Sequence, residues 1–196
     1  MGQIFKKNIL ISSAGRRVEL VKIWKKELLK HVGKDAVVFA NDLNPDLSAA
    51  CKIADKSFSI CAIKEKNYPE ILLQECLKRN IGLIIPTIDK ELKVFSDFRD
   101  LFEGKGVQLL VSDKNLVNFC RDKNLTFELF NSLGINYPEI LSKEDLRYPL
   151  IIKPYDGSSS FGIKKIFGKS EICDFDLHKE GNIFQVLLSS DWEEFS

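Results

Sequence analysis

Residues 151–162 read IIKPYDGSSSFG, and no other stretch of the sequence says as much about its structure. The stretch predicts a strand that ends at Lys153-Pro154, a loop of small residues, and a second strand that resumes at Gly162. Glycines let successive backbone amides turn toward one point, serine hydroxyls approach an anion closely, and Lys153 adds a positive charge. These residue types are typical of a phosphate-binding loop.

A hairpin connection that is rich in Gly and Ser only for flexibility is the competing interpretation of this loop. The Lys-Pro pair at the strand end and the second strand starting at Gly162 are more specific than flexibility requires, so they favour phosphate. The loop is not a Walker A motif, because no Gly-Lys-Ser/Thr sequence opens a helix after it.

Several segments around the loop occur in an order that resembles ATP-grasp enzymes. A predicted helix opens with Asp122-Lys123, stops near Gly134 and is followed by an extended piece that reaches Pro138, and the strand before the loop opens with Tyr-Pro at Tyr148. Three upstream stretches resemble the pre-ATP-grasp domain of ligases of the carbamoyl-phosphate-synthase large-subunit type: NILISSAGRRVEL at 8–20, ND at 41–42 and LIIPTIDKE at 83–91.

The resemblance implies an ATP site in the second half of the chain. Lys123 would reach a phosphate, Lys153 would contact phosphate and adenine, and the small-residue loop would close over the triphosphate. Val186 follows Gln185 where the family has an acid, and residues 189–192 replace the family's glycine turn. The residues that the resemblance assigns to the nucleotide are Lys123, Lys153, Ser158, Ser159, Ser160, Gly162 and Gln185.

The same resemblance implies Mg²⁺ as a second cofactor, held by acidic and Asn residues of a further lobe. Those residues would follow Ser196, so we assign no metal ligand within this sequence and expect the chain alone to be catalytically incomplete. An incomplete lobe leaves an apolar face uncovered, so we also expect a homo-oligomer or a complementary subunit.

The first 112 residues alternate short apolar runs with longer amphipathic stretches, which predicts an α/β domain with a doubly wound, Rossmann-like parallel sheet. From residue 113 the pattern changes to two consecutive helices and then to antiparallel strands. We therefore expect a pre-ATP-grasp domain at 1–112 and the incomplete first α+β lobe of an ATP-grasp domain at 113–196. The first domain is expected to hold strands at 8–12, 36–40, 57–60, 83–86 and 107–111 and helices at 16–30, 46–51, 68–79 and 90–102.

Two turns at the carboxyl edge of this predicted sheet are candidates for binding an acceptor substrate, because open α/β sheets place ligands at that edge. For Arg16 and Arg17 a solvated first helical turn is an equal alternative, and for Thr87 and Asp89 a helix start is slightly favoured. Asp42 suits a ribose contact or a turn, and the single glycine argues against a dinucleotide fingerprint. The candidate substrate residues are Gly15, Arg16, Arg17, Thr87 and Asp89.

Composition excludes several functional classes. Twenty-nine Lys and Arg against 28 Asp and Glu give a net charge of +1, which offers no basic field for nucleic acid. No segment has the roughly 20 apolar residues that cross a membrane, and the amino end lacks a signal-peptide pattern, so we expect the cytoplasm. The five cysteines contain no C-x-x-C pair, which favours reduced thiols over disulfides or zinc.

The leading hypothesis is an ATP-grasp carboxylate-amine ligase, which would form an acyl-phosphate when completed by its second lobe and would act on small-molecule carboxylate and amine substrates. A non-catalytic nucleotide-binding or assembly module is the alternative. An NAD-binding oxidoreductase domain rests only on the β-α-β start of the sequence.

Overall fold

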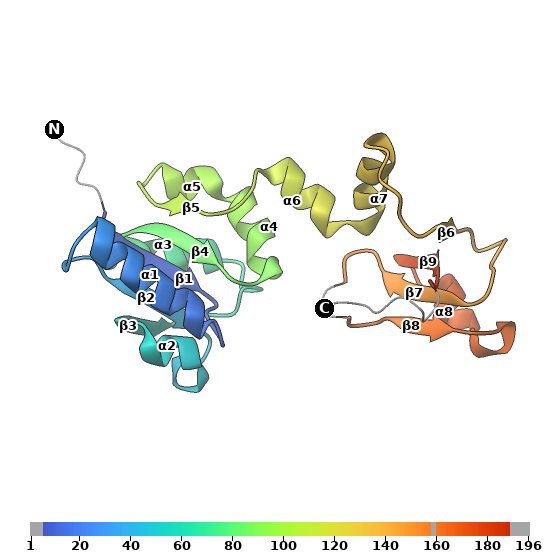
Figure 1. Ribbon diagram of the computed structural model, residues 1–196, viewed down its shortest axis with the longest axis horizontal. Helices are drawn as coiled ribbons and strands as arrows, with labels where there is room; N and C mark the ends of the chain where they lie inside the picture. The colour runs from blue at the N-terminus through green and yellow to red at the C-terminus, as the bar shows by residue number, and fades with distance from the viewer. Residues whose placement is uncertain (1–5, 158–159, 189–196) are drawn as a thin grey trace. The chain divides into compact units, whose positions relative to one another are not determined.

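The computed structural model describes residues 6–157 and 160–188. The chain divides into two compact units, Met1–Val117 and Asn118–Ser196. Each unit has its own sheet and its own core (Figure 1). The domain boundary expected after residue 112 stays a prediction, since helix α6 (Lys114–Arg121) runs across the division between the units.

The first unit is built on a parallel sheet in the order β3-β2-β1-β4-β5, which confirms the predicted α/β fold. Its strands are β1 (Asn8–Ser12), β2 (Val38–Asp42), β3 (Lys56–Ser59), β4 (Ile81–Pro86) and β5 (Gln108–Leu109). Its helices are α1 (Val18–His31), η1 (Pro45–Leu47), α2 (Ala49–Ile53), α3 (Tyr68–Lys78), α4 (Asp89–Asp97) and α5 (Arg99–Glu103).

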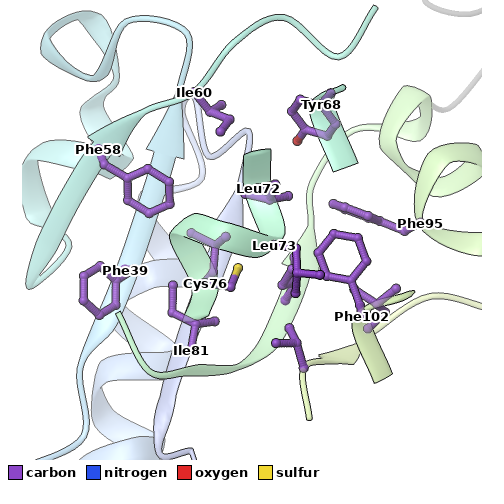
Figure 2. Close-up of a cluster of buried hydrophobic side chains, with 14 residues drawn as sticks. Phe39, Phe58, Ile60, Tyr68, Leu72, Leu73, Cys76, Ile81, Phe95 and Phe102 are labelled. Atoms are coloured by element: carbon purple, nitrogen blue, oxygen red, sulfur yellow. The ribbon is translucent and has the colours of Figure 1, made fainter. Parts of the chain in front are cut away.

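Apolar side chains project from both faces of this sheet, as expected of parallel strands with helices on either side. Ile9 and Ile11 of β1 pack in one cluster with Val21 and Leu28 of α1. Leu10, which points to the opposite face, belongs to a larger cluster with side chains from α3, α4 and α5. Figure 2 shows part of this larger cluster, including Tyr68, Leu72, Phe95 and Phe102.

The single helix expected at 90–102 is instead two helices, α4 and α5, that meet at Phe98. The Ser96 hydroxyl donates a hydrogen bond to the Lys93 carbonyl, a local bond that competes with the helical pattern. The break still lets Phe95 and Phe102 meet edge to face in the core, with ring centroids 5.8 Å apart.

The second unit pairs an antiparallel sheet with helices, in the strand order β6-β9-β7-β8. Leu150 and Ile152 of the central strand β7 pack with Ile166 and Phe184 into a small core. Strand β6 has only two residues and was not expected from the sequence. The elements are α7 (Lys123–Ser132), β6 (Ile140–Leu141), β7 (Leu150–Pro154), β8 (Lys164–Ile166), η2 (Lys169–Glu171), α8 (Asp174–His178) and β9 (Asn182–Val186).

Candidate functional site

Lys153 and Gln185 meet on one face of the antiparallel sheet of the second unit. Ile151 pairs with Gln185 in the β7-β9 register, so Lys153, two residues further along β7, is its diagonal neighbour on the same face. The Lys153 Nζ donates a hydrogen bond of 2.5 Å to Gln185 Oε1. The Gln185 Nε2 donates to the Pro138 carbonyl at 2.6 Å, so the buried amide of Gln185 holds the lysine in a fixed direction.

An aromatic pair lies beside Lys153. Its Nζ is 5.4 Å from the centroid of the Phe127 ring, within the range of a cation–π contact. Phe127 in turn stacks on Tyr137, with centroids 5.0 Å apart and an interplanar angle of 22°. The ammonium group therefore sits between an aromatic face and a neutral amide oxygen.

Lys123 links the first turn of α7 to the loop after β7. The Asp122 carboxylate caps this helix by accepting a hydrogen bond from the Asn124 N–H at 2.8 Å. The Lys123 Nζ donates to the Gly157 carbonyl at 2.8 Å and to the Tyr155 carbonyl at 3.3 Å. The backbone N–H of Lys123 also donates to Tyr155, at 3.0 Å. The start of the loop is thus fixed to the helix by three hydrogen bonds from one residue.

Both lysines have a lowered pKa. Burial is the main cause for each, because it disfavours the charged form. For Lys153 the positive charge of Lys123 lowers the pKa further. For Lys123 the carboxylates of Asp156 and Asp122 act in the opposite direction and raise the pKa. The two cations are close enough to repel each other, and an anion placed near them would relieve that repulsion.

Gly157 and Gly162, in the described parts of the loop between β7 and β8, both lie close to Pro154. A Cβ at Gly157 would lie 2.6 Å from the Pro154 Cγ, which no side chain tolerates without movement. Gly162 and Ser160 both have positive φ, of 78° and 57°, and both are exposed. Ser158 and Ser159, which the sequence assigned to the nucleotide, lie outside the described residues.

The predicted acceptor residues of the first unit fall at the carboxyl edge of its sheet. Gly15 has a φ of 49°, and its N–H donates to the Asp42 carboxylate at 3.0 Å, so Asp42 acts here as a turn residue. The Gly15 carbonyl accepts from the Ala50 N–H and the Ser48 hydroxyl. Arg16 and Arg17 follow with exposed side chains, before the first turn of α1.

Thr87 does not cap α4. The position before this helix is Ile88, and the Thr87 hydroxyl instead lies 3.0 Å from the Ser12 carbonyl and 2.7 Å from the Ser13 carbonyl, to which it donates. Asp89 is the exposed first residue of α4. The hydroxyl of Thr87 therefore supports the turn after β1.

Glu91 is a buried acid whose importance the sequence did not reveal. Its side chain is fully buried, and its Oε1 lies 2.5 Å from the Ser12 hydroxyl and 2.6 Å from the Tyr68 hydroxyl, both of which can donate to it. Asn41, also fully buried, accepts from the Ser13 N–H at 2.9 Å. Within the described part of the chain, Glu91 Oε2 and Asn41 Nδ2 have no hydrogen-bond partner. Burial raises the pKa of Glu91, more than its hydrogen bonds lower it.

Residues 6–157 and 160–188 contain no group of three or more His, Cys, Asp or Glu side chains that could hold a metal ion. In the same residues no helix combines the length and the apolar character needed to cross a membrane.

The chain combines a five-stranded parallel α/β unit with an antiparallel sheet, and the resemblance to ATP-grasp enzymes found in the sequence is confirmed at the level of the fold. The chain belongs to the family described as PylC-like, N-terminal domain, whose profile matches residues 9–110, just over half of the 196 residues.

Curated proteins with a similar sequence include ligases and resistance proteins. A D-alanine--D-alanine ligase from Anaplasma marginale (strain Florida) is 41% identical over 68 residues, which cover 30% of this chain and 20% of that protein. The vancomycin B-type resistance protein VanB of Enterococcus faecalis is 27% identical over 125 residues, covering 60% of this chain and 34% of that protein. The chain thus matches about a third or less of the length of these relatives.

Solved structures share the fold over almost the whole chain. The L-amino acid ligase from Bacillus licheniformis gives a TM-score of 0.63 at 16% identity, covering 92% of this chain and 44% of the other. The biotin carboxylase domain of the Hydrogenobacter thermophilus 2-oxoglutarate carboxylase, solved with MgADP, ADP and bicarbonate, gives 0.66 at 17% identity, covering 95% and 45%. At such identities the likeness shows the fold alone.

Proposed function

We propose that the second unit binds ATP and that the chain forms the first part of an ATP-grasp ligase that joins a small-molecule carboxylate to an amine. The observation that carries the proposal is the pair Lys123 and Lys153. Lys123 of α7 donates a hydrogen bond to the start of the Gly- and Ser-rich loop, and Lys153 lies at the end of β7, just before that loop. The ligase names of the relatives support the reaction class.

The hydrogen bonds of the Lys123 and Lys153 ammonium groups explain how an anion would bind. Their acceptors are a side-chain amide oxygen and two backbone carbonyls, all neutral. A phosphate oxygen is a stronger acceptor for an ammonium group than a neutral oxygen, because both partners are then charged. Binding would also return both pKa values toward the ordinary lysine range, since a nearby negative charge favours the protonated form.

In this proposal Lys153 and Lys123 contact the phosphates, and Ser158 to Gly162 cover them. Gln185 fixes the direction of Lys153 from the adenine side, since its amide is already shared between Lys153 and the Pro138 carbonyl. Arg16 and Arg17, at the sheet edge of the first unit, are the proposed contacts for a carboxylate substrate. Mg²⁺ would neutralise phosphate charge when bound.

The finer classification is also a proposal. The stretches at 8–20 and 83–91 support a ligase of the carbamoyl-phosphate-synthase type, and an acyl-phosphate intermediate follows from that class. We likewise propose a cytoplasmic location and a partner or second copy that completes the enzyme. Phosphate release from ATP that requires both a carboxylate and an amine would support the ligase reaction.

Calorimetric titration of ATP with Mg²⁺ into the purified chain tests the nucleotide site. Lys153→Ala removes a charge-assisted contact, so we expect a loss of affinity of about 10- to 100-fold. Lys179→Ala is the control, because Lys179 is an exposed lysine at the end of α8, whose Leu177 packs with Leu150 and Ile152 on the other face of the sheet. Equal weakening by both variants, or no heat of binding with the wild-type chain, would contradict the proposal.

A further inference from the structure

A hollow of about 230 Å³ opens at the carboxyl edge of the parallel sheet in the first unit. Its walls come from the segments that follow β1, β2, β3 and β4, which is where open α/β sheets hold ligands. The residues that line it are Ser13, Asp42, Leu43, Ile60, Cys61, Ile63 and Ile88. Of these, Ile88 lies between Thr87 and Asp89, which the sequence had singled out as substrate contacts, and we call this hollow the edge pocket.

The lining of the edge pocket is apolar except at one end. Leu43, Ile60 and Ile63 contribute aliphatic side chains, and the carboxylate of Asp42 is the one charged group among the lining residues. One oxygen of that carboxylate accepts the Gly15 N–H at 3.0 Å, and the other is 3.5 Å from the Asn44 N–H. A carboxylate has about four acceptor positions, so Asp42 retains capacity for a cationic donor.

The polar end of the edge pocket is held in place by buried groups behind it. Ser13 has a φ of 51°, an unusual conformation for a serine. Asn41 accepts the Ser13 N–H, and the Thr87 hydroxyl donates to the Ser13 carbonyl. Asn41 of β2 and Thr87, just after β4, thus hold the turn after β1 from both sides. This part of the pocket wall is therefore preformed before a ligand binds.

The size of the edge pocket limits its occupant. Its volume lies below the roughly 300–1,000 Å³ of pockets for drug-sized ligands and above the roughly 150 Å³ of an apolar cavity that admits benzene. The edge pocket therefore suits a small molecule with a short aliphatic chain.

We propose that the edge pocket binds a small aliphatic molecule through its primary ammonium group, which Asp42 receives, while Leu43, Ile60 and Ile63 enclose its apolar chain. This inference deepens the proposed function, on which it rests for the role of the ligand as the amine substrate. An aliphatic amino acid and a simple aliphatic amine share this chemistry, and the experiment separates them.

The test is a titration of three probes of the same branched chain into the whole chain without ATP, followed by amide chemical shifts. Leucine carries ammonium and carboxylate, isopentylamine only the ammonium, and 4-methylpentanoate only the carboxylate. We expect leucine and isopentylamine to bind with a Kd on the order of millimolar, and 4-methylpentanoate, which Asp42 repels, not to bind. Tighter binding of leucine than of isopentylamine would identify an amino acid as the ligand.

Two variants with matched controls locate the binding. Asp42→Asn keeps an oxygen for the Gly15 N–H and removes the charge, so we expect about a tenfold loss of affinity for isopentylamine. Leu43→Ser, at a side chain that is 65% exposed, should leave the fold intact and weaken binding roughly threefold. Asp46→Asn and Leu47→Ser change the same residue types in exposed positions of η1 outside the lining, and should alter affinity by less than about twofold.

Two results would overturn the inference: no binding of either ammonium probe at concentrations of about ten times the expected Kd, or binding that Asp42→Asn and Leu43→Ser leave unchanged. ATP titrated into the same samples separates this inference from the proposed function. Lost ATP binding with retained amine binding would count against the nucleotide site alone, and the reverse would count against the edge pocket alone.

Discussion

The turn that follows β1 and the loop that follows β7 each contain a glycine in the left-handed region, Gly15 in the turn and Gly162 in the loop. Behind the first turn, Asn41 and Glu91 are fully buried and bonded to other side chains of the same unit. At the second loop, Ser160 and Gly162 are exposed, and the nearby cations bond to neutral oxygens.

This difference indicates that the polar groups at the two strand ends have different roles. Hydrogen bonds from its polar groups hold the turn after β1 in a fixed conformation. Because Ser13 of this turn lines the edge pocket, that part of the pocket wall is fixed as well. The loop after β7 keeps positive charge close to oxygen atoms that a phosphate would replace. Substitutions behind the first turn should therefore change stability, and substitutions around the second loop should change binding.

The largest loss of stability is expected for Asn41→Ala. The change leaves the part-buried Ser13 N–H without its acceptor and removes packing volume at a fully buried position, which together cost about 2–3 kcal/mol. Asn124→Ala, at an exposed position of α7, is the control and should stay within about 0.5 kcal/mol. Urea unfolding of both variants measures the difference in stability. Equal unfolding midpoints for the two variants would contradict the structural role of the polar groups behind the turn after β1.

The pH dependence of stability should depend on Glu91. Because burial raises the pKa of Glu91, its carboxyl keeps its proton to higher pH in the folded protein than in the unfolded chain, where glutamates titrate at about pH 4.3. The stabilisation is fully present below the unfolded pKa and is lost as the pH rises through the folded pKa. We expect Glu91→Gln to flatten this decline, because the amide has no proton that titrates in this range.

Melting temperatures of the wild type and Glu91→Gln at a series of pH values check this expectation. Parallel curves for the two proteins would show that the Glu91 carboxyl does not keep its proton in the folded state.

A smaller effect is expected for Thr87→Val. This substitution keeps the shape of the side chain but removes the hydroxyl that donates to the Ser12 and Ser13 carbonyls, so it should cost about 1 kcal/mol. It should also weaken isopentylamine binding, because the turn that lines the edge pocket loses a support. Chemical denaturation together with the probe titration measures both quantities, and an unchanged pair of values would mean that Thr87 does not hold the turn.

The smallest effect on stability is expected for Phe161→Ser, because this side chain is 84% exposed, and the change should stay within about 0.5 kcal/mol. Phe167 and Phe175, also in the second unit, are 64% and 69% exposed. Exposed apolar groups of this size favour association. Sedimentation should therefore show a mass that grows with concentration in the wild type and grows less in the variant, and a constant monomer mass in the wild type would contradict the expected self-association.

Local patterns in the sequence were enough to predict several features. The alternation of apolar runs predicted the parallel sheet, and Lys153-Pro154 marks the observed end of β7. Lys123 begins α7 as expected. In each case neighbouring residues carry the information, so a short window suffices.

Other features depend on residues that are distant in the sequence. Glu91 follows Asp89 and Lys90 in a pattern that also suits a solvated first helical turn, yet its partners Ser12 and Tyr68 lie 79 and 23 positions away. Strand β6 has two residues, too few for a period to appear. The edge pocket likewise combines segments from four strand ends, whose adjacency follows from the sheet order alone.

Mapping ATP binding on the backbone amides of the whole chain by NMR tests most directly the claim that the second unit receives the nucleotide. We expect shifts at Lys123, Lys153, Gln185 and the loop from Gly157 to Gly162, with the amides of Ser13 and Gly15 unchanged. Shifts confined to the turn after β1, or no shifts at saturating ATP, would contradict the claim that the second unit binds the nucleotide.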